Sequence, residues 1–140
     1  MKGGALKTYY LDTSALLKGF FQERETQAYK QFLDDCVSRG DELVISRLTF
    51  TEFYCVLKRR LRPEDSWDKA ARDTLANFVV CPVAESDYLQ AAHSEWRLRG
   101  AEALHLAAAV RLNCDAMLVF DQNSPLPPRL RVWKFPSSNI

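Results

Sequence analysis

The sequence predicts an α/β fold built on a central parallel sheet of four to five strands, and three observations support this. Short apolar runs that fit buried strands alternate with longer segments whose apolar residues recur at helical spacing. The segment 101–112, AEALHLAAAVRL, is apolar nearly all round, which is typical of a helix buried on more than one face. Alternating strands and helices favour a parallel sheet with right-handed crossovers. Ligands of such sheets bind beyond the carboxyl ends of the strands.

The first elements follow from hydrophobic pattern alone. Residues 8–11 are a short apolar run that predicts a buried strand, and the pattern turns helical at the hydroxyl pair Thr13 and Ser14. Residues 26–39 carry one apolar stripe at helical spacing, and LVIS (43–46) predicts the second strand.

Two helices are expected in the middle of the chain. Residues 48–61 have aromatic and leucine side chains at helical spacing, and Pro63 ends that helix. Residues 66–78 predict a further helix, with Ser66 or Asp65 as its cap.

The last third of the chain repeats the alternation. FVVCPV (78–83) predicts a third strand, and Ser86 can cap a helix that runs to about Arg97. That helix would present one apolar side, formed by Leu89, Ala92 and Trp96. After helix 101–112, Asn113 suits the left-handed conformation of a helix end. The remaining strands are AMLVF (116–120) and an edge strand at 129–135.

Composition predicts one globular domain spanning residues 1–140. Hydrophobic residues make up 47% and charged residues 26%, and the formal net charge of +1 neither favours nor excludes a nucleic-acid partner. No apolar run approaches the roughly 18 residues of a membrane span, and the N-terminus has no signal-peptide pattern. The cysteines lack metal-site spacing and predict reduced thiols in a cytoplasmic protein. They are Cys36, Cys55, Cys81 and Cys114.

Four acidic residues stand where this topology brings elements together. Asp12 ends the first strand and Asp121 ends the strand 116–120. Glu52 and Glu102 lie in the first turns of two helices. Each acid alone has a simpler explanation, because first-turn acids favour the helix dipole, Asp12 fits an N-cap and Asp121 fits a turn. Together they predict one acidic crevice.

An acidic crevice predicts a divalent cation. Two ionised carboxylates about 4 Å apart repel by roughly 4 kcal/mol at an effective dielectric constant of 20, so protons or cations must neutralise them. Oxygen ligands suit Mg²⁺ or Mn²⁺, which also engage phosphates. Such ions activate water and stabilise the leaving oxygen in phosphodiester cleavage.

Other polar residues near these acids have two interpretations each. Thr13 or Ser14 could hold a metal-bound water or a phosphate oxygen, or could cap the first helix. Asn123 could be an outer ligand or a turn residue. His105 shares a helix face with Glu102 and could contact substrate, support a ligand, or be a buried histidine with satisfied hydrogen bonds.

Basic residues supply candidate contacts to a phosphate backbone. Arg97 and Arg99 precede Glu102 and lie nearest the inferred crevice. A second group would also neutralise the end of the helix 48–61. Its members are Lys58, Arg59, Arg60 and Arg62.

These motifs resemble the PIN domain family. YYLDTSALLK, ISRLTFTEFYCVLKRR and GAEALHLAAAVRLNCDAMLVFDQN are similar to its successive motifs, in order, over residues 9–123. The chain is most similar to VapC-like toxins. The resemblance implies a three-layer α/β/α fold, a Mg²⁺- or Mn²⁺-dependent ribonuclease, a homodimer and a small inhibitory antitoxin. It assigns metal binding and catalysis to Asp12, Glu52, Glu102 and Asp121.

One departure and two alternatives remain open. The third acid of the family is more often Asp, and the extra methylene of Glu102 moves its carboxylate by about 1.5 Å. A PIN fold that binds RNA or protein without cleavage is therefore an alternative. LDTS also resembles the start of an aspartyl-nucleophile phosphatase loop, although Ser14 stands where that chemistry usually needs a second acid.

Overall fold

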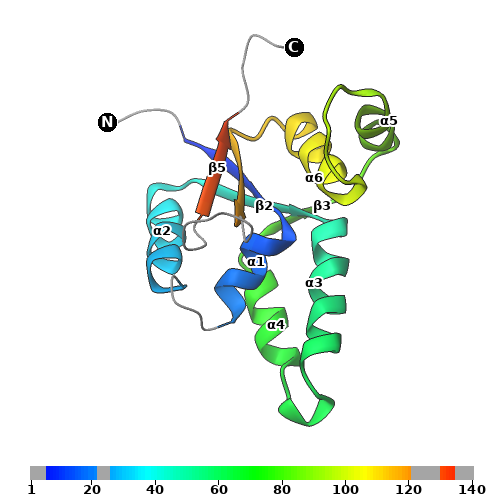
Figure 1. Cartoon of the computed structure of the whole chain (residues 1–140). Coiled ribbons are helices and arrows are strands. Elements are labelled where there is room, and N and C mark those ends of the chain that lie inside the picture. The colour runs from blue at the N-terminus through cyan, green and yellow to red at the C-terminus, as the bar shows by residue number, and fades with distance from the viewer. Residues whose placement is uncertain (1–5, 22–25, 121–129, 135–140) are drawn as a thin grey trace, which may run out of the picture.

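A five-stranded sheet forms the centre of the computed structural model, which describes residues 6–21, 26–120 and 130–134 (Figure 1). The strand order is β3-β2-β1-β4-β5. The first four strands are mutually parallel, and β5 pairs antiparallel with β4 at the edge. The predicted parallel sheet and its edge strand are thus confirmed. The strands are β1 (Thr8–Leu11), β2 (Glu42–Ser46), β3 (Val79–Cys81), β4 (Ala116–Phe120) and β5 (Leu130–Lys134).

Helices cover both faces of the sheet, which gives the expected three layers. Side chains of α1, α2, α3 and α4 build one core cluster with the sheet, and α6 builds the other, with α5 packed on α6 (Figure 1). The helices are α1 (Thr13–Phe20), α2 (Thr26–Arg39), α3 (Arg47–Arg60), the short 3₁₀ helix η1 (Pro63–Asp65), α4 (Asp68–Leu75), α5 (Glu85–His93) and α6 (Gly100–Arg111).

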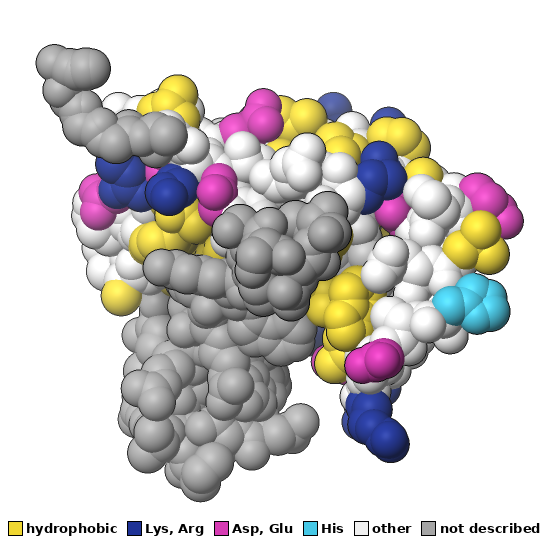
Figure 2. Space-filling model, turned by 90° about the horizontal axis from the view of Figure 1, so that it is seen from above, with side chains coloured by type: hydrophobic (Ala, Val, Ile, Leu, Met, Phe, Trp, Pro, Cys, Tyr) yellow, Lys and Arg dark blue, Asp and Glu magenta, His cyan; other side chains and the backbone are white. Residues whose placement is uncertain are grey.

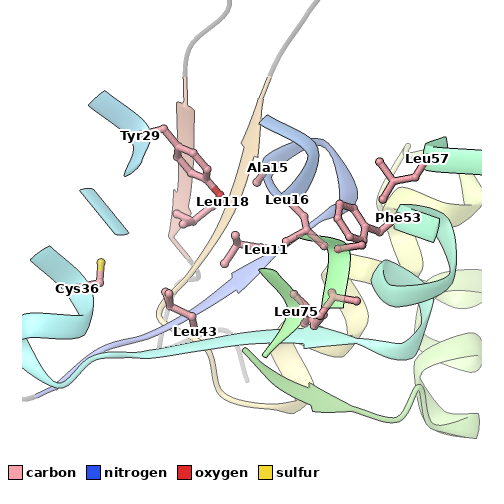
Figure 3. Close-up of a cluster of buried hydrophobic side chains, with 12 residues drawn as sticks. Leu11, Ala15, Leu16, Tyr29, Cys36, Leu43, Phe53, Leu57, Leu75 and Leu118 are labelled. Atoms are coloured by element: carbon pink, nitrogen blue, oxygen red, sulfur yellow. The ribbon is translucent and has the colours of Figure 1, made fainter. Parts of the chain in front are cut away.

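Strand alternation divides the core between the two faces. On β1, Leu11 joins the cluster under α1–α4, whereas Tyr10 joins the cluster under α6. Leu118 and Met117 divide in the same way on β4. Figure 3 shows the first cluster, where Phe53 meets the sheet side chains from α3. Each fully buried large side chain of this kind contributes about 1.5–3 kcal/mol to folding.

The buried face of helix α6 is rich in alanine, which allows a close approach to the sheet. Ala108 and Ala109 are fully buried there, and the larger His105 and Leu106 are buried with them. Asn113 has φ 58°, which confirms the predicted left-handed residue after this helix. The helix therefore has the buried position that its sequence predicts.

The segment between Pro63 and Leu75 differs from the prediction. A separate turn, η1, forms first, because proline suits the first position of a helix and not its interior. Ser66 ends η1 in the left-handed conformation, and Asp65 accepts a hydrogen bond from the Arg62 backbone N–H. Neither of them caps the following helix, so that expectation was wrong.

Helix α5 also differs from its prediction. It is capped by Asp87, which accepts a hydrogen bond from the Ala84 N–H, and not by Ser86. Leu89, expected on a buried side, is 52% exposed. The prediction failed because a polar contact fixes the helix: Asp87 is fully buried and pairs with Arg111 of α6.

Two expectations concern the chain as a whole. All four cysteines are free thiols, two of them buried and two half-buried. Among the described residues, no helix has the length and apolar character needed to cross a bilayer.

Candidate active site

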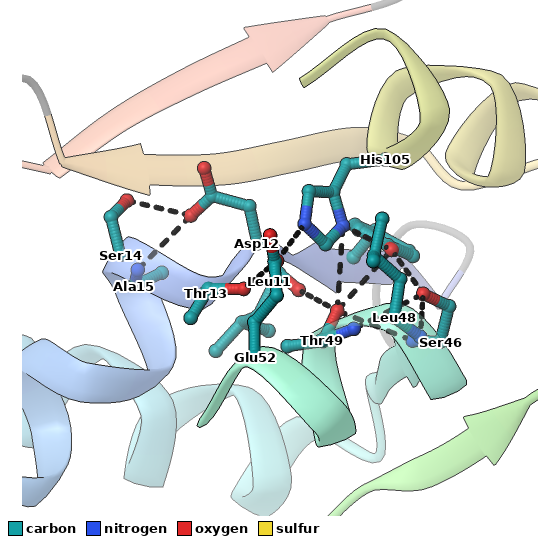
Figure 4. A network of polar contacts seen from close by, with 11 residues as sticks. Leu11, Asp12, Thr13, Ser14, Ala15, Ser46, Leu48, Thr49, Glu52 and His105 are labelled. Carbon is teal, nitrogen blue, oxygen red and sulfur yellow. Dashed lines mark hydrogen bonds and ion pairs between the residues drawn. The ribbon is translucent and has the colours of Figure 1, made fainter. Parts of the chain in front are cut away.

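Asp12 stands at the junction of β1 and α1. Its backbone is extended, and its Oδ1 accepts hydrogen bonds from the Ala15 N–H (3.1 Å) and the Ser14 hydroxyl (2.6 Å). Asp12 itself is therefore the N-cap of α1, and neither Thr13 nor Ser14 has that role. Its Oδ2 accepts no hydrogen bond from the part of the chain that the structure describes, and Figure 4 shows it pointing away from α1.

Burial raises the pKa of Asp12 above its ordinary value. The hydrogen bonds from Ser14 and Ala15 and the charge of nearby His105 lower that pKa and only partly offset the effect of burial. An ionised Asp12 is consequently under-stabilised by its protein surroundings, and a bound cation would supply the missing stabilisation.

Glu52 reaches the same region from α3. Its Oε1 accepts hydrogen bonds from the Thr13 hydroxyl (2.5 Å) and from Nε2 of His105 (2.8 Å). The bond from His105 holds the pKa of Glu52 below its ordinary value; burial opposes this and the bond from Thr13 adds to it. Because Thr13 directly follows Asp12, its bond brings the second carboxylate beside the first (Figure 4).

His105 is buried between the carboxylate and the sheet. Its Nδ1 lies 2.7 Å from the Tyr10 hydroxyl, which in turn donates to Ser46 (2.8 Å) and lies 3.3 Å from the Thr49 hydroxyl. Of the two interpretations that the sequence left open, the buried histidine with satisfied bonds agrees with this structure, and it also supports Glu52. Sequence reasoning missed Tyr10, Ser46 and Thr49, although S-x-x-T at the start of α3 is a capping pattern that marks two of them.

Glu102 is placed differently from the other two acids. It is exposed in the first turn of α6, and its Oε1 accepts a hydrogen bond from the Arg99 N–H at 3.3 Å. Within residues 6–21, 26–120 and 130–134, no three His, Cys, Asp or Glu side chains gather closely enough to hold a metal by themselves. The capping bond accounts for Glu102 locally.

Asp121 and Asn123 lie outside the described residues. The strand that precedes them is placed: β4 ends at Phe120 and pairs in parallel with β1, with Leu118 beside Leu11. The Asp12 backbone N–H also donates to the Leu118 carbonyl. The carboxyl ends of β1 and β4 are therefore adjacent, as the prediction of a shared crevice requires.

The donor set of Asp12 and Glu52 fits a Mg²⁺ or Mn²⁺ ion. Each carboxylate has one oxygen fixed by protein hydrogen bonds and a second oxygen that accepts none from the described residues. Carboxylate oxygens are the ligands these ions prefer, and Mg²⁺ is commonly held by one or two carboxylates together with water and phosphate.

The candidate RNA-binding residues are exposed and belong to two separate elements. Arg97 and Arg99 precede α6, and Lys58 and Arg59 lie in the last turn of α3. The face in Figure 2 shows basic side chains interspersed with acidic ones over the described residues. No extended basic surface is visible on that face.

A cavity of about 300 Å³ lies elsewhere, between α1, α2, β2 and α4. Leu16, Tyr29 and Phe78 are among its lining residues, and neither Asp12 nor Glu52 borders it. The acidic pair therefore sits at the edge of the sheet, apart from this cavity.

These observations define an α/β protein with a half-buried acidic pair at the carboxyl edge of a parallel sheet. The sequence pattern of the PIN domain matches residues 9–125, and the chain therefore belongs to the PIN domain family. A comparison with curated protein sequences gave no match.

Solved structures share the fold at low sequence identity. The Mycobacterium tuberculosis toxin VapC20, described as cleaving the sarcin–ricin loop, is 18% identical with a TM-score of 0.63, covering 82% of this chain and 91% of that one. A toxin–antitoxin complex from Klebsiella pneumoniae is 20% identical with a TM-score of 0.63, and the match covers 85% of this chain and 92% of that one. VapBC2 from Rickettsia felis, bound to a promoter DNA fragment, is 11% identical with a TM-score of 0.60, and the match covers 76% of this chain and 83% of that one.

Proposed function

We propose that this chain is a Mg²⁺- or Mn²⁺-dependent endoribonuclease and the toxin of a toxin–antitoxin pair. The observation that carries the proposal is the acidic pair of a PIN domain: Asp12 and Glu52 each hold one oxygen in protein hydrogen bonds and keep a second oxygen for a cation. A bound divalent cation supplies an activated water and stabilises the oxygen that leaves the RNA phosphodiester.

The protein's own residues orient this site. Ser14 and the Ala15 N–H fix Asp12, while Thr13 and His105 fix Glu52, so both carboxylates are preorganised before RNA binds. We assign Asp121 and Glu102 as the further acids of the site, with Asn123 as an outer ligand. Arg97, Arg99, Lys58 and Arg59 would contact the RNA backbone.

The proposed partners are RNA, a small antitoxin protein and a second copy of the chain. The structural neighbours support the first two: one is described as a toxin that cleaves the sarcin–ricin loop and another as a toxin–antitoxin complex. Free, unpaired cysteines agree with a reducing cytoplasm as the place of action. Sedimentation at tens of micromolar, alone and with the product of an adjacent small reading frame, tests both protein partners; a strictly monomeric chain that ignores that product would contradict them.

RNA cleavage with added metal is the decisive test of the activity. The native chain should cut single-stranded or loop RNA with Mg²⁺ or Mn²⁺ and be inert in excess EDTA. Asp12→Asn should abolish cleavage and leave the metal-free fold as stable or more stable, because burial already disfavours the charge on Asp12. Asp34→Asn, at an exposed position on α2, is the matched control and should cleave normally. Cleavage that survives EDTA would overturn the metal mechanism.

A second candidate function rests on Glu102. Its carboxylate caps its own helix, which favours a PIN fold that binds RNA or protein with weak or no cleavage. RNA binding by a native chain that shows no cleavage in any divalent metal would select this candidate.

A further inference from the structure

We propose that Tyr10 is a positioning residue for the site: it anchors the ring of His105, and His105 in turn orients Glu52 toward the cation. The inference rests on the proposed function only in taking Glu52 as a metal ligand. It concerns a buried tyrosine of the central strand that makes no contact with either carboxylate itself.

The burial of this polar chain requires an explanation. Tyr10, Ser46 and Thr49 are fully buried, and His105 is only 3% exposed. A buried polar group costs free energy unless it is hydrogen-bonded, and an apolar group of similar shape would fill the same space at little or no cost to stability. Ser46 and Thr49 are explained by the capping box of α3, so Tyr10 and His105 are the buried polar groups that still need an explanation. Among the described residues, the network leads from His105 to the half-exposed Glu52.

The available donors and acceptors determine which nitrogen of His105 carries the proton that is shared with Glu52. Glu52 already accepts a hydrogen bond from the Thr13 hydroxyl, and a carboxylate that serves as a metal ligand can only accept hydrogen bonds. The proton in the 2.8 Å contact must then reside on Nε2. His105 thus donates to the same oxygen as Thr13, which leaves the other oxygen of Glu52 directed away from both donors.

The Tyr10 hydroxyl anchors the opposite side of the His105 imidazole ring. This hydroxyl lies 2.7 Å from Nδ1, whereas Thr49 lies at 3.5 Å and donates to the Leu11 carbonyl. Without the Tyr10 hydroxyl, the bond to Glu52 and the longer contact with Thr49 would be the hydrogen bonds left to the imidazole among the described residues. Substitution of residues that orient a metal ligand typically lowers metal affinity 10- to 100-fold.

The substitution Tyr10→Phe tests the proposal, with Tyr9→Phe as its matched control. Tyr9 is the neighbouring residue on β1, and it packs on Phe32 of α2, on the opposite face of the sheet. We expect Tyr10→Phe to weaken Mn²⁺ binding about tenfold in calorimetry and Tyr9→Phe to leave binding unchanged. Metal-free urea unfolding of both variants separates loss of fold from loss of affinity.

Nitrogen NMR of the metal-free chain gives a readout independent of metal and RNA. The chain has two histidines, and exposed His93 provides the internal reference. We expect a slowly exchanging Nε2–H signal from His105 in the native chain and in Tyr9→Phe, and its loss by exchange in Tyr10→Phe.

The outcomes separate this inference from the proposed function. Native-level Mn²⁺ binding by Tyr10→Phe, or a His105 signal that it leaves unchanged, would overturn the inference while the nuclease proposal stands. Absence of that signal in the native chain would overturn it as well, even if Tyr10→Phe failed to fold. A native chain that binds no Mn²⁺ yet shows the protected signal would overturn the proposed function and the role of the anchored ring in metal binding together.

Discussion

Asp12 can serve the fold and the proposed chemistry with different atoms of one side chain. Oδ1 caps α1 through the Ala15 N–H, a contact that stabilises a helix by about 1 kcal/mol, and Oδ2 remains for a cation. Glu52 divides its oxygens in the same way, with Oε1 held by Thr13 and His105. Structural and catalytic explanations of these acids are therefore compatible.

Glu102 is the acid whose role the capping bond leaves open. Glu102→Gln keeps an oxygen for the Arg99 N–H, so stability should change by less than about 1 kcal/mol. If the residue serves the cation, Glu102→Gln should slow RNA cleavage by about a hundredfold, a loss of roughly 2.7 kcal/mol in transition-state stabilisation. Glu102→Asp should retain most activity, because Mg²⁺ sites can bridge through water. Turnover unchanged in Glu102→Gln would make the residue a helix cap only.

At the scale of elements, the position of α5 depends on one ion pair, whose carboxylate is buried and whose guanidinium is partly exposed. Asp87 accepts two hydrogen bonds from the Arg111 guanidinium, and Arg111 also donates to the Pro82 carbonyl. The exposed leucine and tyrosine of α5 show that an apolar stripe does not fix this helix. A polar contact between residues 24 apart in sequence does so instead.

Removing this pair should be costly, whereas removing an exposed pair should not. Asp87→Ala removes a buried carboxylate that accepts hydrogen bonds from Arg111 and from the Ala84 N–H, and should lower the free energy of unfolding by about 2 kcal/mol. Asp73→Ala breaks the exposed pair with Lys69 on α4 and should cost less than about 1 kcal/mol. Urea unfolding measures both, and equal losses would refute the special role of Asp87.

The start of β1 depends on a carboxylate and should respond to acid. Asp41 accepts hydrogen bonds from the Lys7 N–H and from Arg39; burial raises its pKa, but these bonds outweigh burial and hold it below the ordinary value of 3.8. Its stabilisation is therefore complete above the unfolded-state pKa and is lost as pH falls through the lower folded-state value.

Asp41→Asn should consequently destabilise the chain by about 1–2 kcal/mol near neutral pH. The difference from the native chain should shrink as pH falls through the folded-state pKa of Asp41, which lies below 3.8, because the native carboxyl then also becomes neutral. Urea unfolding near neutral pH and below this pKa measures it, with Asp34→Asn as the exposed control. A difference independent of pH would show that charge is not what Asp41 contributes.

For the whole molecule, metal binding and folding should be linked. Mn²⁺ at about a hundred times its dissociation constant should add about 2.7 kcal/mol to the free energy of unfolding. For a chain of this length, that is a rise in melting temperature of about 8 °C. Asp12→Asn should remove the rise, and an equal rise in the variant would place the ion elsewhere.

The strands and helices followed from short-range pattern, and so did the acids that stand at their ends. Asp12 and Glu52 could be predicted because Asp12 directly follows a strand and Glu52 lies in the second turn of a helix, and the hydrophobic pattern indicates the position of both elements. The contacts of Tyr10 with His105 and of Asp87 with Arg111 could not, because their partners are 95 and 24 residues away in sequence. Polar pairing across the fold leaves no periodic signal, so these contacts required coordinates.

The outer strand β3 has a consequence for self-association. It is only three residues long, and Pro82 follows it directly, so the next position has no N–H to offer a neighbouring chain. Val79 is 46% exposed there, yet so short a border gives an incoming strand little to pair with. At the β3 edge the sheet therefore resists fibrillar growth. Two copies of the chain would instead meet through helices or through the opposite edge of the sheet, at β5. Pro82→Val would restore the missing donor and should increase aggregation of the native state under agitation.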